Sequence, residues 1–570
     1  MQRFIAQCGL PLAAGALAML SACGGSDDDV LPQLTAATSS SLSGTCEALA
    51  AKLSTLANTT ITATTTVATG TLTAGGQSVA AHCRVTGSMY SRTSTVDGNA
   101  YAIGFEMRLP VAWNGRFFHQ VNGGTDGNIG TATGPVGGGG PLSNALAQGF
   151  AVVSSDAGHT NAQNPTFGID PQARLDYGYQ AVAKITPMAK SVIQAAYGRQ
   201  PDRSYLGGCS NGGRHAMVAA ARYGDQYDGI LVGDPGTALP LAALANMAGA
   251  QAYSALATTA SDISTGFTVA ERTLVSNAVL AKCDALDGVA DGLVQATAAC
   301  QSAFNLSRDV PTCSGARDGT CLSAAQKTAI AGLFAGATTS TGSTIYSSFP
   351  YDAGLATTGW ASWKFTSSVS TARDPGATAF IWQVPPASPT GFDGPTFALT
   401  SNITTLLAAI QATNATYTEN SLSFMMPPHL DQVDTLRGRG GKVMLYHGTS
   451  DPIFSPDHTV KVWNGWNQTY YGKAAEFARL FLVPGMNHCS GGPSTDQFDM
   501  LTPLVNWVEK GQAPDSVVAT ARGTGNVGGV NTDVPSTWSP TRTRPLCAYP
   551  KVARYKGSGS IETADSFSCS

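Results

Sequence analysis

The stretch Tyr205-Leu206-Gly207-Gly208-Cys209-Ser210-Asn211-Gly212-Gly213 contains the pattern Gly-x-Ser-x-Gly between a predicted strand and a predicted helix. Small residues on both sides of Ser210 let the backbone turn sharply, so that the hydroxyl stands exposed above a sheet at a helix N-terminus. Ser210 is therefore a candidate nucleophile. Because glycine- and serine-rich loops also produce this pattern by chance, the rest of the chain has to supply a base, an acid and an oxyanion site.

Six segments share one plan, a short apolar run followed by a turn rich in Gly or Asp. Helical stretches such as 175–197 lie between them. Short buried strands with crossover helices are typical of a parallel sheet whose functional residues collect beyond the carboxyl ends of the strands. We therefore predict an α/β fold with an edge strand within 59–75 and core strands within 115–124, 149–158, 203–213, 227–236, 442–451 and 478–488.

This rhythm stops between Gly236 and about Arg437, where two cysteine pairs, Pro-rich turns and helical stretches such as 270–281 predict an inserted lid domain. The expected organisation is a core in two parts, 44–236 and 437–570, with the lid at 237–436 between them. An acidic, Ser/Thr-rich linker is expected at 24–43.

Residues 1–23 resemble a lipoprotein-type export signal, since a short apolar run ends in small residues before Cys23. Lipid on Cys23 would make the protein an anchored outer-membrane lipoprotein. The alternative is an ordinary cleaved signal with release into the periplasm or the medium. Apart from the signal, no apolar run is long enough to span a membrane.

Charged residues make up only 12% of the chain and the formal net charge is −4. Without a basic cluster, nucleic acid is not an expected partner. A chain with 43% apolar residues is ample for a large core. We expect a monomer that contacts a membrane only through a lipid at Cys23.

A nucleophilic serine needs a base to take its proton and a carboxylate to orient that base. Asp451 and His488 each follow a predicted late strand. The order Ser210, Asp451, His488 is that of the α/β-hydrolases. His447 and His458 also lie near Asp451 in sequence, but His447 falls within the strand end, so we favour His488 as the base.

The ten cysteines that remain after Cys8 and Cys23 are set aside favour five disulfides in an exported chain. If Cys209 pairs with Cys489, the backbones of Ser210 and His488 are at most roughly 14 Å apart. Two free buried cysteines are the alternative for these two positions. Nearest neighbours in sequence suggest the other pairs: Cys46 with Cys83, Cys283 with Cys300, Cys313 with Cys321, and Cys547 with Cys569.

The tetrahedral oxyanion requires backbone N–H donors near Ser210. One donor is the residue after the nucleophile, Asn211, and a loop after an early strand usually gives the second. In the loop after 117–121 we choose Gly124, with Gly123 as the alternative.

Three carboxylates, Asp284, Asp287 and Asp291, lie on a loop with two Asp-Gly turns. Such hard oxygen ligands suit Ca²⁺, although Asp-Gly also marks plain turns and the spacing is not that of an EF-hand. The position in the lid favours a structural ion.

Five blocks together resemble the tannase and feruloyl esterase family over nearly the whole mature chain: WNGRFF (113–118), GCS (208–210), CDALDG (283–288), FLVPGMNHCSGG (481–492) and TRPLC (543–547). The resemblance implies an α/β-hydrolase core with a large lid, the triad above and a Cys209–Cys489 bond. It also implies a lid calcium bound by Asp284, Asp287, Asp291 and the carbonyls of Val289 and Leu293.

Substrate recognition is implied to lie in the lid. Arg373 matches an arginine that holds a substrate carboxylate in the family's terephthalate half-ester hydrolases, and a guanidinium fork suits that group. Trp363 and Phe454 match aromatic positions of the pocket. The chain departs from the pattern of these half-ester hydrolases at two positions. They have phenylalanine where this chain has Ala377, and glutamate where it has Asn211.

The expected function is a serine carboxylesterase acting on a small aromatic ester without an organic cofactor. A terephthalate half-ester is the first expectation, and feruloyl or galloyl esters are the second. A surface lipoprotein that binds aromatic ligands without turning them over is the alternative of another class.

Overall fold

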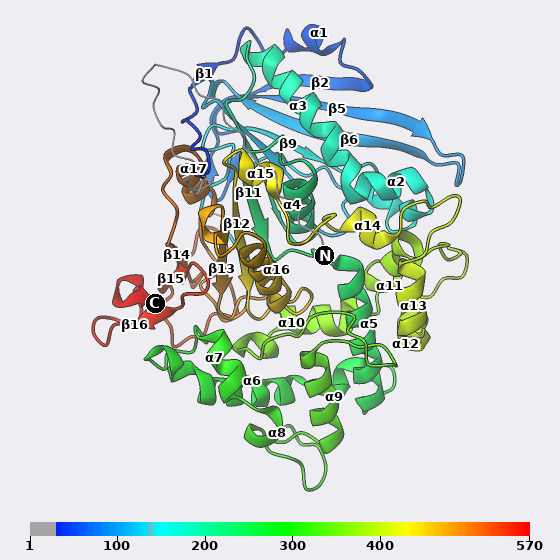
Figure 1. Ribbon diagram of the computed structural model, residues 1–570, viewed down its shortest axis with the longest axis vertical. Helices are drawn as coiled ribbons and strands as arrows, with labels where there is room; N and C mark the ends of the chain where they lie inside the picture. Colours follow the sequence, from blue (N-terminus) through cyan, green and yellow to red (C-terminus); the bar gives the residue numbers. More distant parts are fainter. Residues whose placement is uncertain (1–29, 136–137, 141) are drawn as a thin grey trace, which may run out of the picture.

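A computed structural model describes residues 30–135, 138–140 and 142–570. Its centre is a nine-stranded sheet of order β13-β12-β11-β10-β8-β9-β6-β5-β2 (Figure 1). The strands from β13 to β9 in this order run parallel, as predicted. They are β8 (Arg116–Gln120), β9 (Ala151–Ser155), β10 (Arg203–Cys209), β11 (Gly229–Gly233), β12 (Lys442–Gly448) and β13 (Ala478–Val483).

Three antiparallel strands complete the sheet beside β9. The outermost, β2 (Thr59–Val67), is the expected edge strand, whereas β5 (His82–Thr93) and β6 (Ala100–Pro110) were not predicted. A readable signal was present, because Cys83, Val85 and Met89 alternate with polar residues and are all buried. This period of two is that of a half-buried strand.

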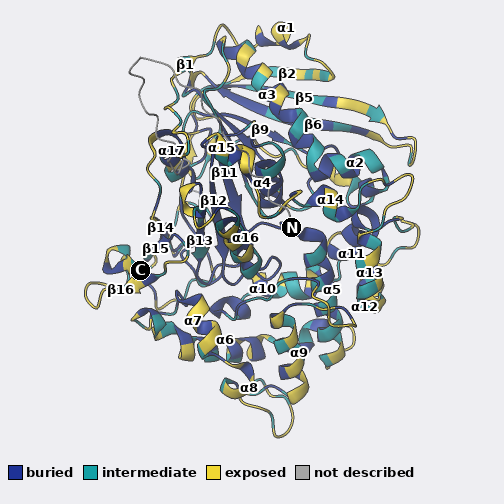
Figure 2. Cartoon of the chain, in the orientation of Figure 1, coloured by how far each residue is buried: buried dark blue, intermediate teal, exposed yellow. Residues whose placement is uncertain are grey.

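Neighbouring residues of the central strands enter different cores because successive side chains point to opposite faces of a sheet. Phe117 packs into one cluster and Phe118 into the other. One cluster includes α3 (Ala181–Tyr197), α4 (Asn211–Arg222) and α16 (Pro456–Thr469), and the other includes α17 (Leu501–Lys510). Figure 2 shows these central strands as buried.

The elements between β11 and β12 are helical, and most of them lie in the lower part of Figure 1, whereas the last two helices lie higher. We call residues 237–436 the helical insertion; its status as a separate domain stays a prediction. Its helices are α5 (Leu239–Leu256), α6 (Val269–Cys283), α7 (Thr297–Ala303), α8 (Leu306–Asp309), α9 (Ala324–Ala335), α10 (Thr358–Ala361), α11 (Asp374–Gly376), α12 (Gly394–Thr400), α13 (Ile403–Ile410), α14 (Ser421–Met425) and α15 (Asp434–Gly438).

The N-terminal stretch expected as a linker is bonded to the core in its described part. Ser40–Ser41 forms β1, which pairs with β7 (Ala112–Trp113), and the Ala37 N–H donates to Glu509 Oε2. Short elements at the other end include β14 (Ser516–Thr520), β15 (Thr543–Cys547), β16 (Ala553–Tyr555) and β17 (Phe567–Cys569). The predicted signal and Cys23 lie outside the described residues.

Among the described residues, no helix is both long and apolar enough to cross a membrane. All five disulfides expected from the sequence are present. Disulfides persist in oxidising surroundings, so the chain has the covalent structure of an exported protein.

Candidate active site

Ser210 sits on the sharp turn between β10 and α4, with φ +68° and ψ −127°. This strained backbone exposes the hydroxyl beyond the sheet. The glycines of the motif let the loop after β8 approach closely. A Cβ on Gly208 would lie 2.2 Å from the Val121 carbonyl oxygen, and one on Gly212 would lie 2.5 Å from it.

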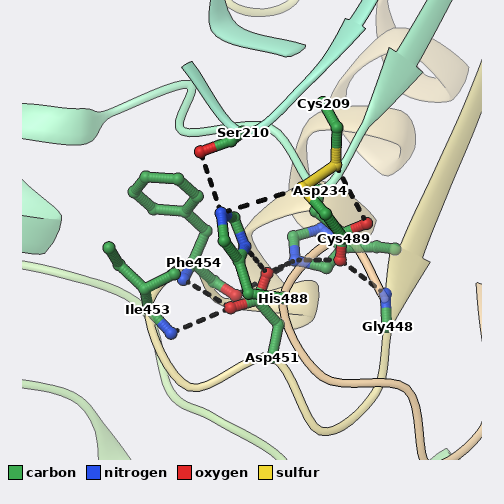
Figure 3. Close-up of a disulfide and its surroundings, with 10 residues drawn as sticks. Cys209, Ser210, Asp234, Gly448, Asp451, Ile453, Phe454, His488 and Cys489 are labelled. Carbon is green, nitrogen blue, oxygen red and sulfur yellow. Dashed lines mark hydrogen bonds and ion pairs between the residues drawn. A yellow bond between two sulfur atoms is a disulfide. The ribbon is translucent and has the colours of Figure 1, made fainter. Parts of the chain in front are cut away.

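His488 joins Ser210 to Asp451 (Figure 3). Its Nε2 lies 2.8 Å from Ser210 Oγ and its Nδ1 lies 2.7 Å from Asp451 Oδ2. The other Asp451 oxygen accepts hydrogen bonds from the N–H groups of Ile453 and Phe454 at 2.8 and 3.0 Å. A serine, an imidazole and a fixed carboxylate in this chain of contacts can remove and return the serine proton.

Asp451 is the ionised partner of the histidine. Burial alone would raise the pKa of its carboxyl, but His488 and His447 lower it below the ordinary value. Asp234, which follows β11, lies close to Asp451 (Figure 3), and burial raises the pKa of the Asp234 carboxyl above its ordinary value. His447 turns its Nδ1 to Thr459 Oγ1 at 2.8 Å, as expected for a structural side chain.

Cys209 and Cys489 form a disulfide with Cα atoms 6.1 Å apart. These residues directly precede Ser210 and follow His488, so the bond joins the loops of β10 and β13 beside the reacting groups (Figure 3). The pairing is the one on which the expected closeness of Ser210 and His488 rested.

The loop after β8 reaches Ser210 from the other side. A Cβ on Gly123 would lie 3.6 Å from Ser210 Cβ, whereas one on Gly124 would lie 3.6 Å from Arg373 Nη1. Gly124 has φ +66°, a conformation that favours glycine. Asn211 is the first residue of α4, at the helix N-terminus. The structure thus brings both predicted oxyanion segments to the nucleophile.

A cleft of about 430 Å³, its open mouth included, lies above Ser210. The helical insertion forms one wall with Trp363, Arg373 and Ala377. Trp363 and Phe454 each pack edge-on to the His488 ring, with centroids 5.2 Å apart. The Arg373 guanidinium lies 5.8 Å from the Trp363 ring centroid. All the predicted substrate-binding residues therefore border one cleft.

The family model for tannase and feruloyl esterase matches residues 83–570. The chain belongs to the tannase and feruloyl esterase family. Mono(2-hydroxyethyl) terephthalate hydrolase from Piscinibacter sakaiensis is 42% identical over 87% of this chain and 86% of its own length. A probable feruloyl esterase B-2 from Aspergillus flavus is 27% identical over 77% of this chain and 80% of its own length. This member of the family is a carboxylic ester hydrolase.

Solved structures of the family share the fold. Feruloyl esterase B from Aspergillus oryzae superposes with a TM-score of 0.72 at 24% identity, covering 92% of this chain and 99% of its own. Tannin acyl hydrolase from Aspergillus niger gives a TM-score of 0.65 at 19% identity, covering 92% and 94%. The fold is therefore the predicted α/β-hydrolase.

The acidic loop after α6 partly fits a cation. Asp287 Oδ2 is buried without a hydrogen-bond partner in the described part of the chain, and burial with two neighbouring carboxylates raises the pKa of Asp287 to about 7. Asp284 already accepts the N–H groups of Asp291 and Gly292, both at 2.9 Å. Asp291 forms an ion pair with Arg544, which competes with a metal for that carboxylate.

Sequence reasoning missed several residues of this family member's cleft. Tyr177, Trp382 and Asp374 also line it. The only sign of Asp374 in the sequence was its position next to Arg373. Tyr177 and Trp382 gave no sign, because the sequence does not show which surface an aromatic residue borders. Asp126 and His215, which do not line the cleft, were also missed, because a contact between a loop and a helix leaves no pattern in the sequence.

Proposed function

We propose that Ser210, His488 and Asp451 hydrolyse esters of aromatic acids through an acyl-enzyme. His488 takes the proton of Ser210 as its Oγ attacks the ester carbonyl, and Asp451 stabilises the imidazolium. His488 then protonates the leaving alcohol and activates the water that releases the acid. The observation that carries this proposal is the continuous Ser210–His488–Asp451 contact at the base of the cleft.

The N–H of Asn211 and an N–H of the 123–124 loop are proposed to hold the tetrahedral oxyanion. Both segments lie beside Ser210, and preorganised donors at that position stabilise the charge that develops in the transition state. The likeness to the family does not assign these donors, so the assignment rests on the position of the two segments.

For substrate we place a terephthalate half-ester first. Arg373 borders the same cleft as Ser210, and a guanidinium pairs well with a free carboxylate. The relative from Piscinibacter sakaiensis carries the name of such a hydrolase. Feruloyl or galloyl esters are the second candidate. Asp374 favours them, because this residue borders the cleft and its buried Oδ2 has no hydrogen-bond partner among the described residues, so it can accept a phenolic hydroxyl that reaches it.

The experiment compares kcat/KM for mono(2-hydroxyethyl) terephthalate, methyl ferulate and a gallate ester in the native enzyme, Arg373→Ala and Ser210→Ala. We expect Arg373→Ala to lower kcat/KM by about 10- to 100-fold for the half-ester only, the value of a hydrogen bond to a charged group. An equal loss of kcat/KM on all three esters would refute the proposal that Arg373 binds the substrate carboxylate. Native turnover by Ser210→Ala would refute the serine mechanism itself.

Two further assignments are proposals. Asp284, Asp287, Asp291 and the carbonyls of Val289 and Leu293 would hold a structural Ca²⁺, supported by the orphaned Asp287 oxygen. Bound calcium would neutralise the carboxylates and fix the loop. Export with lipid on Cys23 is the proposed location, and mass spectrometry of the mature N-terminus is the measurement.

A further inference from the structure

Asp126 links the loop after β8 to helix α4. Its carboxylate Oδ2 lies 2.8 Å from Asn211 Nδ2 and 2.8 Å from His215 Nε2. Asn211 and His215 are four residues apart, so both side chains lie on one face of α4. Because α4 begins directly after Ser210, the carboxylate joins the glycine loop to the helix that starts at the nucleophile.

Arg214 fixes which way the Asn211 amide points. Its Nε donates to Asn211 Oδ1 at 2.6 Å, and its two terminal nitrogens donate to the carbonyls of Gly178 and Tyr177 at 2.7 and 2.9 Å. Since a guanidinium can only donate, the amide oxygen must face Arg214 and the amide nitrogen must face Asp126. Glutamate at this position has no N–H to give and would set two buried carboxyl groups against each other.

The loop is held on its other side as well. Asp126 has φ +56°, its N–H donates to the Gly123 carbonyl at 3.3 Å, and its own carbonyl accepts from Asn164 Nδ2 at 3.0 Å. The Thr125 carbonyl lies 2.8 Å from His159 Nε2. Because these contacts anchor the loop after β8, the Asp126 carboxylate determines where this loop contacts α4.

Burial makes the Asn211 side-chain N–H donor to this carboxyl necessary. Asp126, Asn211 and His215 are nearly inaccessible to solvent. Burial raises the pKa of Asp126 to about 7, and His159, Arg214 and Asn211 oppose that rise. A buried acceptor that loses its donors costs more than the bond contributed.

We propose that the side chains of Asp126 and Asn211 are positioning residues that set the separation between the Asn211 N–H and the N–H groups of the 123–124 loop. They touch neither ester nor nucleophile; they hold the two sides of the oxyanion site at one spacing. This inference rests on the proposed serine mechanism. It gives the Asn211 side chain a role that its backbone N–H does not require.

The test measures kcat, KM and the affinity of phenylboronic acid, a probe that forms a tetrahedral adduct with the serine, in Asp126→Ala, Asn211→Ala and the double variant. A displacement of the donors acts on the transition state, so we expect each single variant to lose about 100-fold in kcat and a comparable amount of boronate affinity, with KM within about threefold. The double variant should lose no more than either single one, because both remove the same contact.

Two variants separate positioning from general damage. Asp126→Asn keeps an oxygen that can accept from Asn211, and we expect it to retain most of the native kcat. Glu509→Ala is the matched control, since Glu509 ties β8 to β10 near their amino ends through Arg116 and Tyr205; it should lower thermal stability and leave kcat unchanged.

Additive losses, an unchanged boronate affinity, or a kcat that falls as far in Glu509→Ala would overturn the proposal. If Asp126→Ala does not fold, Asn211→Ala and Asp126→Asn carry the test. Native activity in Ser210→Ala would refute the proposed function instead, and is therefore a separate outcome.

Discussion

Asp287 is the residue on which the calcium proposal depends, because one of its oxygens is buried without a partner among the described residues. We expect a chelator to lower the Tm of the native protein by about 2–3 °C, since a ligand at about 100 times its Kd stabilises by about 2.7 kcal/mol and the unfolding entropy of a chain this long is large. Calorimetry with and without EDTA, together with elemental analysis for calcium, measures this.

Two variants make that experiment specific. In Asp287→Asn the chelator should have little effect on Tm and the calcium content should fall. Asp393→Asn removes a carboxylate of the same insertion that only caps α12, so its response to EDTA should equal that of the native protein. A native protein that contains no calcium, or whose Tm is unchanged by EDTA, would contradict the calcium assignment.

The nucleophile, base and acid were placed from sequence because each follows a strand of the parallel sheet, and parallel strands end at one edge. The same argument favoured His488 over His447 as the base, because His447 falls within a strand end. The structure places His488 in contact with Ser210. Asp126 could not be found this way. Its importance depends on the contact between a loop and the side face of a helix, and neither shows a pattern in the sequence.

At the scale of elements, the parallel strands were predictable because they are short, buried on both faces and bounded by Gly or Asp. The antiparallel strands β5 and β6 were missed although their alternation is visible. Most helices of the insertion have fewer than ten residues. Such short helices have too few turns to show a periodic apolar face, so the sequence does not predict them. Only stretches such as that around α6 were identified.

The Cys209–Cys489 bond ties the loops of β10 and β13 together. Both residues are partly accessible to solvent, so mild reduction should reach the bond. We expect activity to fall before circular dichroism reports unfolding, because a shift of about 1 Å between Ser210 and His488 can cost about 100-fold in rate.

The paired variant Cys209→Ala/Cys489→Ala should reproduce that loss of kcat without reductant. Cys313→Ala/Cys321→Ala removes a disulfide that closes a short segment of the insertion and should keep native kcat. Full activity in protein whose Cys209–Cys489 bond is shown by mass spectrometry to be reduced would count against the coupling.

In the whole molecule, the active site is assembled from distant parts of the chain. Ser210 comes from before the helical insertion, Asp451 and His488 from after it, and the insertion itself supplies Trp363 and Arg373 to the cleft. The core could be predicted because its two parts continue one sheet. The surface that the insertion presents to the core is set by packing between helices, which sequence patterns do not specify.

Glu509 joins four parts of the molecule near the amino-terminal ends of β8 and β10, away from the cleft. It accepts hydrogen bonds from Arg116 Nε and Nη2, both at 2.6 Å, from the Tyr205 hydroxyl at 2.8 Å and from the Ala37 N–H at 2.9 Å. Burial would raise the pKa of Glu509, but these partners hold it below the ordinary value of 4.5. A lowered pKa in the folded state means that the charged carboxylate stabilises the fold.

That stabilisation is complete above the unfolded pKa and is lost as the pH falls through the folded pKa. At pH 7, Glu509→Gln should therefore lower the free energy of unfolding by about 3 kcal/mol, the cost of breaking a buried pair. Below the ordinary value of 4.5 the carboxyl of the unfolded chain takes up a proton while the native carboxylate stays charged, so the difference should shrink until the pH has passed the folded pKa. Urea unfolding of both proteins at pH 7, 5 and 4 measures it. A difference that stays constant over this range would show that Glu509 acts through packing and that its charge contributes nothing.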